Sequence, residues 1–429
     1  MAVRGRVERA GVDRNAFGHA GRASFTESAR RRRILASAVR TLSAVLERNG
    51  HPTFSDAEFA RRLAAVRAKM DERALALLLL YGARHTAEIA YLSNWPGTRE
   101  AFLVVPREAD LTLLVQLYNH VPNARRVAIT GDVRWAGARS IDAVMTAIAE
   151  RSLPDGRAVG LVGAWRWHDV DSLRERFPRL RFVEAGDIVR DLRAIKSAEE
   201  LAFLRTAARF TDLAMRALER EVRPGMREHE LATIVESSYG REGGTHGIHF
   251  MATTPMRDPQ IGVPSQLQSS RVIARGDVLI TEISAEHWGY TGQIHRAYAV
   301  GEAPTQAYRA LHDVAVEAYE RIRDVLRDGA TVGDVLDAAE AVHERGYTIY
   351  DDLLHGASQL PPIIQTRRTK RGGWREDFVF REDMVVVVQP NVVKDDERMG
   401  LQVGETLRVT KAGVERLHDY PMEFIVTGG

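Results

Sequence analysis

The chain changes its pattern at the stretch Asp191–Glu200, which reads DLRAIKSAEE. Ser197 followed three residues later by Glu200 is typical of a capping box, which satisfies free backbone donors where a helix begins. Apolar and small residues then recur at steps of three and four, namely Leu201, Leu204, Ala208, Thr211, Met215 and Leu218. A long helix with one buried face is therefore expected after Ser197. The Pro224-Gly225 step ends it, and a second helix is expected around residues 231–235.

Upstream of this stretch, residues 51–190 predict a smaller α/β domain. An amphipathic helix is expected over 58–71, and short apolar runs at 74–80, 101–105 and 111–115 are typical of strands. Helices that alternate with strands indicate an α/β domain. Residues 1–50 are expected to form an arm with one helix, because four apolar residues there have helical spacing: Ile34, Ala38, Leu42 and Leu46.

Downstream, residues 191–429 predict an α+β domain with a substantial sheet. Apolar runs at 278–283 and 384–388 are typical of strands with a deeply buried face. Helical spacing is found over 307–327 and 332–343.

Composition excludes several classes of protein. The chain has 429 residues, 45% of them apolar, which suits two globular domains. With 60 basic and 58 acidic residues, its formal net charge is only +2, which gives no strong positive electrostatic potential to attract nucleic acid or an anionic membrane. It has no cysteine, so metal binding by thiolates and catalysis by a cysteine nucleophile are excluded. The longest apolar run, 74–80, is too short to span a bilayer. We expect a cytoplasmic protein whose partners are a small-molecule substrate and another copy of itself.

The motifs resemble those of the creatinase, prolidase and aminopeptidase P family. The resemblance covers residues 54–429 and rests on Asp191–Glu200 and on five further motifs: Phe59-Ala60-Arg61-Arg62-Leu63, Tyr91-Leu92-Ser93, Arg223-Pro224-Gly225-Met226, Gly276-Asp277-Val278-Leu279-Ile280 and Gly289-Tyr290 with Arg296. It implies a homodimer, and a C-terminal pita-bread domain whose curved antiparallel sheet holds the active site.

The resemblance also implies five metal-ligand positions, which hold two divalent ions in metal-using relatives. They fall here on Glu282, Gln293, His355, Gln389 and Gly404. Glu405 would face the site only if its strand slipped by one residue, which turns a side chain to the other face. One carboxylate and one imidazole cannot hold two dications, so no metal is expected. A single zinc ion on Glu282, His355 and water is the alternative.

Creatinase, a metal-free branch of the family, implies other roles. Its pre-strand histidine falls on Ser265, and its two glutamates fall on His295 and Gln389. An imidazole can transfer protons near neutral pH, so His295, His355 and Glu282 are the candidate catalytic residues, with His295 as the leading general base. In the alternative, His295 has no catalytic role: it occupies space that the metal-ligand shell fills in relatives and only hydrogen-bonds to Gln293 or Glu282.

Several other residues are candidates for substrate binding. Gln293 and Gln389 would bind substrate atoms where relatives hold ions. Arg367 or Arg368, with Arg99 from the partner chain, would bind a carboxylate. His249 and Ser265 would border the pocket; His246 and His249 lie in a glycine-rich turn and could instead ligate a metal. Trp288 would pack at a hairpin end or form a pocket wall.

The function expected from the sequence is a metal-independent, creatinase-like enzyme that hydrolyses or eliminates across a C–N bond. Its substrate would be a small carboxylate-bearing amino acid or guanidino compound in specialised metabolism. Two alternatives remain open: a divergent Xaa-Pro metallopeptidase, and a non-catalytic binding protein that keeps the fold.

Overall fold

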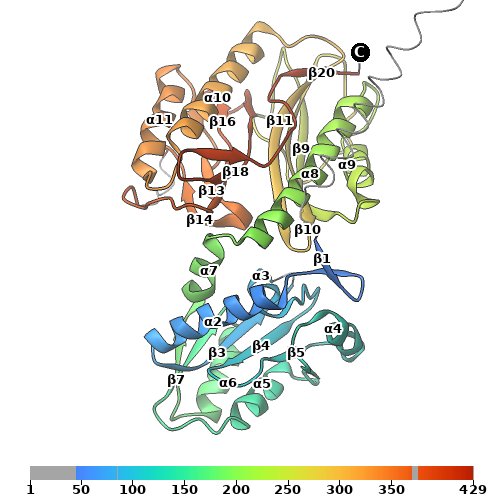
Figure 1. Ribbon diagram of the computed structural model, residues 1–429. Coiled ribbons are helices and arrows are strands. Elements are labelled where there is room, and N and C mark those ends of the chain that lie inside the picture. The colour runs from blue at the N-terminus through green and yellow to red at the C-terminus, as the bar shows by residue number, and fades with distance from the viewer. Residues whose placement is uncertain (1–44, 85, 370–374, 429) are drawn as a thin grey trace, which may run out of the picture. The chain divides into compact units, whose positions relative to one another are not determined.

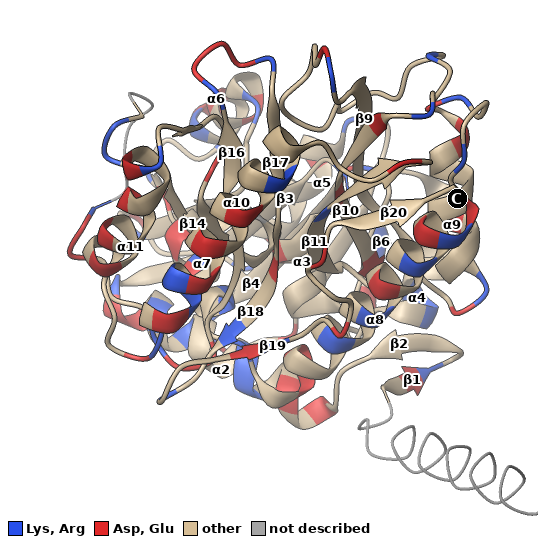
Figure 2. Ribbon diagram, turned by 90° about the horizontal axis from the view of Figure 1, so that it is seen from above, with Lys and Arg blue, Asp and Glu red and all other residues tan. Residues whose placement is uncertain are grey.

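The computed structural model describes residues 45–84, 86–369 and 375–428. The arm predicted for residues 1–50 lies mostly outside these ranges, but Leu46, expected on a helix, lies in strand β1 (Leu46–Arg48), which pairs with β2 (His51–Thr53). No helix of the described residues is long and apolar enough to cross a membrane. Basic and acidic residues are interspersed over the ribbon in Figure 2.

The N-terminal domain is an α/β layer built on a six-stranded sheet of order β6-β5-β4-β3-β7-β8. Its strands are β3 (Leu75–Gly82), β4 (Ala101–Pro106), β5 (Thr112–Val115), β6 (Asp132–Trp135), β7 (Ala158–Val162) and β8 (Arg181–Glu184). Its helices are α2 (Asp56–Glu72), α3 (Ala87–Ser93), α4 (Val121–Val127), α5 (Ser140–Ala149), α6 (Trp167–Arg176) and α7 (Gly186–Ala194).

Strand β3 forms the centre of this domain. All eight of its residues are buried, because helices cover both faces of the sheet (Figure 1). Leu78 and Leu80 pack with α2 and α3, whereas Leu77 and Leu79 pack with α5 and α6. The alternation follows from the two-residue period of a strand.

The C-terminal domain is built on a curved sheet of order β14-β13-β15-β18-β11-β10-β9. Outside this order, β19 pairs with β18 and β20 pairs with β11. The pairs along this order are antiparallel. Its strands are β9 (Thr245–Pro255), β10 (Asp277–His287), β11 (Tyr290–Val300), β13 (Leu354–Gly356), β14 (Leu360–Ile364), β15 (Val385–Val388), β18 (Gly404–Val409), β19 (Val414–Arg416) and β20 (Ile425–Thr427). A second, three-stranded sheet joins β12 (Thr348–Ile349), β16 (Asn391–Val393) and β17 (Gly400–Gln402).

Two helix pairs flank the large sheet, as Figure 1 shows: α8 (Ala198–Glu221) with α9 (Glu230–Gly240), and α10 (Gln306–Val325) with α11 (Val332–Glu344). The capping box predicted at Ser197 and Glu200 is present at the start of α8. Leu279 and Ile283 of β10 pack with α8 and α9. Val278 and Ile280, on the opposite face, pack with α10 and α11. This is the pita-bread architecture expected from the sequence.

Helix α8 and strand β11 approach each other closely at Gly292. A Cβ atom there would lie 2.3 Å from the backbone nitrogen of Ala208, so only glycine fits. Thr211 donates a hydrogen bond of 2.5 Å to the carbonyl oxygen of Gly292 and accepts one of 2.9 Å from the amide of Ala285. These contacts fix the helix against the end of the β10–β11 hairpin that carries the candidate site.

Candidate active site

The pairing of β10 with β11 brings three of the candidate residues together. Glu282 lies directly opposite His295 in the antiparallel register. Gln293, two residues before His295, is on the same face because side chains alternate along a strand. His355 on β13 and Gln389, just after β15, join the cluster from the neighbouring strands.

Short polar contacts join these five side chains. Gln293 Nε2 lies 3.1 Å from Glu282 Oε1, 3.1 Å from His295 Nε2 and 3.0 Å from Gln389 Oε1. Gln389 Oε1 in turn lies 3.2 Å from His355 Nε2, and His355 Nδ1 lies 2.9 Å from the carbonyl oxygen of Gly356. The two amides therefore connect the carboxyl group to both imidazoles. We call these five residues the Glu282 cluster.

Burial gives these groups unusual protonation. It raises the pKa of Glu282 to about 8, and the nearby charges of Asp351 and Asp352 add to the rise. Burial also lowers the pKa of His355, and holds that of His295 well below its usual range. At neutral pH the carboxyl group of Glu282 is therefore mostly protonated, and both imidazoles are neutral.

A cavity of about 360 Å³ opens beside the cluster. Its described lining includes Glu282 and Gln389, with Tyr350, Asp351 and Asp352; the remaining lining residues are Ile248, Phe250, Val263, Pro264 and Gln266. His295 and His355 are fully buried and do not line it. Glu282 is thus the titratable group of the cluster that faces the cavity, and His295 stands behind it.

The register also settles the position of Glu405. Gly404 pairs with His295, and Glu405 pairs with Ile294, so no one-residue slip occurs. The carboxylate of Glu405 faces away from the cluster, where it accepts hydrogen bonds from Arg296 at 2.6 Å and from Tyr319 at 2.9 Å, and pairs with Arg416. It is a buried structural ion pair, and the cluster contains a single carboxyl group.

Two arginines expected to bind a carboxylate lie elsewhere. Arg367 pairs with Asp337 at 2.6 Å and with Glu376 at 2.9 Å, and Arg368 pairs with Glu340 at 2.5 Å. Neither lines the cavity. The expectation for these two side chains is corrected: acidic residues of α11 and of the loop after β14 hold both guanidinium groups at the surface.

Three more expected site residues lie outside the lining of this cavity. The Ser265 hydroxyl donates a 2.7 Å hydrogen bond to the carbonyl oxygen of Leu267, although its neighbours in sequence line the cavity. Trp288 donates a 3.0 Å bond from Nε1 to Asn94 of the N-terminal domain, and both side chains line a separate, small cavity of about 30 Å³. Arg99 is exposed on the N-terminal domain.

His249 also differs from expectation. Its neighbours Ile248 and Phe250 line the cavity, whereas His249 points through the other face of β9 to the hydroxyl of Tyr239 on α9, 2.6 Å from its Nε2. Burial lowers the pKa of His249 to about 4. Because side chains alternate along a strand, His249 faces away from the cavity that its two neighbours line.

Asp351 and Asp352 are the residues that the sequence analysis missed. Both line the cavity, and in sequence they lie four and three residues before His355. Two adjacent acids just ahead of the His355-Gly356 step were the available signal.

Comparison with known proteins agrees with this fold. Residues 62–195 match the model for the creatinase/prolidase N-terminal domain, and residues 202–411 match that for metallopeptidase family M24. The X-Pro aminopeptidase structure from Thermotoga maritima superposes with a TM-score of 0.74 at 21% identity, covering 85% of this chain and 99% of the other. The chain therefore joins a segment that matches the creatinase/prolidase N-terminal domain to one that matches metallopeptidase family M24, and it has the fold of the X-Pro aminopeptidase structure.

Curated relatives of this architecture differ in activity. An Xaa-Pro dipeptidase of Pyrococcus furiosus is 26% identical over 268 residues, which are 62% of this chain and 74% of the relative. An ectoine hydrolase of Halomonas elongata is 22% identical over 411 residues, covering 87% of this chain and 98% of the relative. Both names describe hydrolases, so the family supports hydrolysis while leaving the substrate open.

Proposed function

We propose that this protein is a hydrolase that cleaves a C–N bond of a small, positively charged, amino-acid-derived substrate through proton transfer by Glu282. One observation carries the proposal: a carboxyl group with a pKa raised to about 8 faces a cavity and is joined by two amides to two buried imidazoles. A group with a pKa near the working pH both gives and takes protons efficiently.

The donor set of the Glu282 cluster does not fit a pair of divalent ions. Such ions need several anionic oxygens to replace their hydration, and two-metal sites use carboxylates that bridge the ions. Here one carboxyl group is accompanied by two neutral amides and two imidazoles. The Gln293 side chain, with contacts of 3.0 to 3.1 Å to three partners, already joins the groups between which an ion would have to bind. We therefore derive no step through a metal at this site.

The hydrogen bonds around His355 depend on the orientation of the Gln389 amide. Oxygen atoms face both of its ring nitrogens, from Gly356 at 2.9 Å and from Gln389 at 3.2 Å. A neutral imidazole has a single N–H, so only the charged ring donates to both. That arrangement matches an ionised Glu282, which accepts from Gln293.

A second arrangement keeps both groups neutral. If both amides turn by 180°, Gln389 donates to Nε2 of a neutral His355, and protonated Glu282 donates to the oxygen of Gln293. Burial disfavours two separated charges, which is why it raises the pKa of Glu282 and lowers that of His355. We infer that the amides of Gln293 and Gln389 turn with the protonation of Glu282, so that Gln293 accepts from the protonated carboxyl group and donates to the carboxylate.

A protonated Glu282 suits hydrolysis. Protonated Glu282 donates to the departing nitrogen as the C–N bond breaks. The resulting carboxylate then takes a proton from the water whose oxygen bonds to the carbon, which restores the starting state. Gln293 stabilises the carboxylate in the meantime by donating a hydrogen bond to it from Nε2.

The charge of the cavity indicates the substrate class. Asp351, Asp352 and Glu282 supply three carboxyl groups, and the described lining includes neither lysine nor arginine. An ammonium or guanidinium group complements this wall. A carboxylate on the substrate would need a cation from outside this lining, and we propose that Arg99 of a second copy supplies it.

The test is an activity screen of the purified chain with and without chelator. The panel contains N-substituted guanidino acids, ectoine and Xaa-Pro dipeptides, and the matched variant is Glu282→Gln. We expect turnover of a cationic substrate that survives chelation and falls about 100-fold or more in the variant. Turnover that is unchanged in the variant would refute the role of Glu282.

A divergent Xaa-Pro metallopeptidase is the second candidate, favoured by the names of the relatives. It requires cleavage of Xaa-Pro dipeptides that depends on added Mn²⁺ or Zn²⁺ and stops with chelator. The same screen therefore separates the two candidates.

A further inference from the structure

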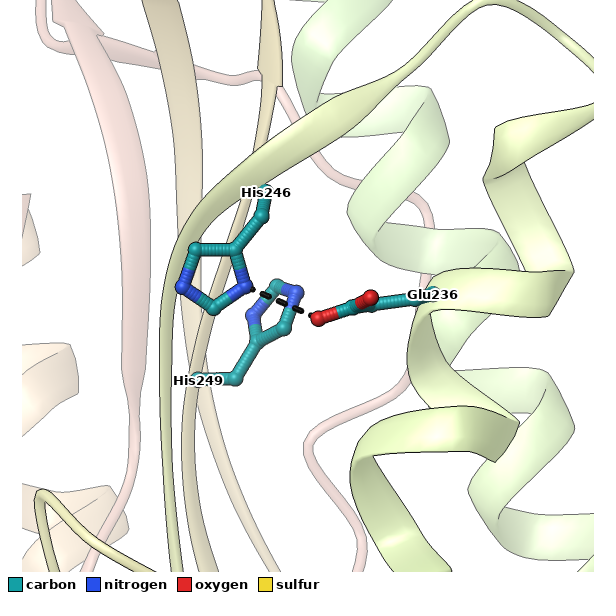
Figure 3. Close-up of side chains that lie close together, drawn as sticks. All are labelled: Glu236, His246 and His249. Atoms are coloured by element: carbon teal, nitrogen blue, oxygen red, sulfur yellow. Dashed lines mark hydrogen bonds and ion pairs between the residues drawn. The ribbon is translucent and has the colours of Figure 1, made fainter.

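Two histidines and a glutamate meet on the far side of β9 from the cavity. Glu236 of α9, His246 and His249 each offer a ligand atom within 4.8 Å of the others (Figure 3). His246 Nδ1 lies 3.1 Å from Glu236 Oε1, and the two imidazole rings stand 4.3 Å apart, edge to face. Ligand atoms around a tetrahedral zinc ion are about 3.3 Å apart, so only small side-chain shifts separate this arrangement from a metal site.

A bulge in β9 explains why the two histidines share a face. Residues three apart on a regular strand point to opposite faces. In the pairing of β9 with β10, Ile248 lies opposite Ser284 but His246 lies opposite Ala285, so Gly247 is an inserted residue. A Cβ atom at Gly247 would lie 2.4 Å from the carbonyl oxygen of Ser284, so the bulge needs glycine. Bulges of this kind re-aim side chains, and this one aims both imidazoles at α9.

Backbone contacts prepare His249 for metal binding. Its Nδ1 lies 2.5 Å from the carbonyl oxygen of Ile248, which can only accept, so Nδ1 carries the ring proton. The lone pair is thereby placed on Nε2. Metal-binding histidines commonly have their other ring nitrogen held by a backbone carbonyl in this way.

We propose that Glu236, His246 and His249 form a site for one zinc-like divalent ion. Two imidazoles and a carboxylate are a known zinc ligand set with a fourth position open to solvent, and imidazole favours zinc, cobalt or nickel over magnesium or calcium. Glu236 and His246 are both about half exposed, so an ion can reach them from solution. Tyr239 donates its hydroxyl hydrogen to Nε2 of His249 and must give way when the ion binds.

Zinc titration of the full chain, stripped by chelator and followed by calorimetry, tests the site. We expect one equivalent to bind, with affinity lowered about 10-fold or more by His246→Ala and by Glu236→Gln. Cobalt(II) should give the intense visible absorption of a tetrahedral ion in the wild-type chain and lose it in both variants. Tyr239→Phe, which removes the competing hydroxyl, should bind zinc at least as tightly.

Two controls make the result specific. His168→Ala removes an exposed histidine 3.2 Å from Asp169 and should leave binding unchanged. Glu282→Gln should also leave it unchanged, which keeps this site distinct from the Glu282 cluster. The proposal is overturned if the wild-type chain takes up no zinc, or if His246→Ala binds it as tightly as the wild type does.

Discussion

Glu282 is the residue at which burial, charge and access to the cavity coincide. Its pKa is raised above its unfolded value, so the folded state holds a proton that the unfolded state has lost. By linkage, the side chain costs no stability below pH 4.5, and its cost grows as the pH rises toward about 8.

The Glu282→Gln variant should reveal this cost. Glutamine fills a similar volume without a charge, so we expect the free energy of unfolding of the variant to exceed that of the wild type increasingly from pH 5.5 to 8.5, by about 3 kcal/mol over that range. Urea unfolding at the two pH values measures it. A difference that stays constant with pH would mean that Glu282 keeps an ordinary pKa.

Asp351 should tune this titration. Its charge is one of the causes that raise the pKa of Glu282, after burial. Asp351→Asn should therefore move the limb of the pH–rate profile that belongs to Glu282 down by about half a pH unit. Asp395→Asn, which changes an exposed acid outside the cavity lining, is the control and should leave the profile in place.

At the scale of elements, the packing of α8 on β11 positions the hairpin that carries Glu282, Gln293 and His295. Gly292→Ala should destabilise the protein by about 2 kcal/mol, because the added methyl group meets the backbone of Ala208. Gly413→Ala is the matched control, since a Cβ atom there has no neighbour within 4 Å. Thermal unfolding compares the two; equal midpoints would show that the helix gives way without cost.

Elements were predictable from sequence where local signals set them. The capping box at Ser197 and the strand runs depend on neighbours in the chain, and they were found within a few residues of their observed bounds. The resemblance assigned the five residues of the Glu282 cluster to one site, and their side chains lie in contact in the structure. Arg367 and Arg368 were placed wrongly, because their partners on α11 are about 30 residues away in sequence. His249 was turned wrongly, because no local signal gives the face of a strand next to a bulge.

At the scale of the whole molecule, Arg62 links the two domains. Its guanidinium is fully buried, lies 2.7 Å from Glu58 of the same helix and 3.7 Å from Glu200 at the start of α8, and stacks 3.9 Å from the ring of Phe54. A buried network of this kind is costly to break from one side, because it leaves uncompensated charges.

Arg62→Met should therefore destabilise the protein by about 3 kcal/mol or more. The control is Arg61→Met, since Arg61 pairs with the same Glu58 but has a half-exposed side chain, and should cost less than about 1 kcal/mol. Denaturant unfolding of the full chain compares them. Equal losses would show that the buried charges are not what joins the domains.

We propose that the Glu282 cluster transfers protons and does not bind two metal ions. The most direct test is to soak a crystal in Mn²⁺ and Zn²⁺ and to calculate anomalous difference maps. We expect no pair of metal peaks between Glu282 and His355, and a single zinc peak beside His246 and His249. Two strongly occupied peaks within the Glu282 cluster, lost in Glu282→Gln, would contradict the account and favour a dinuclear metallopeptidase.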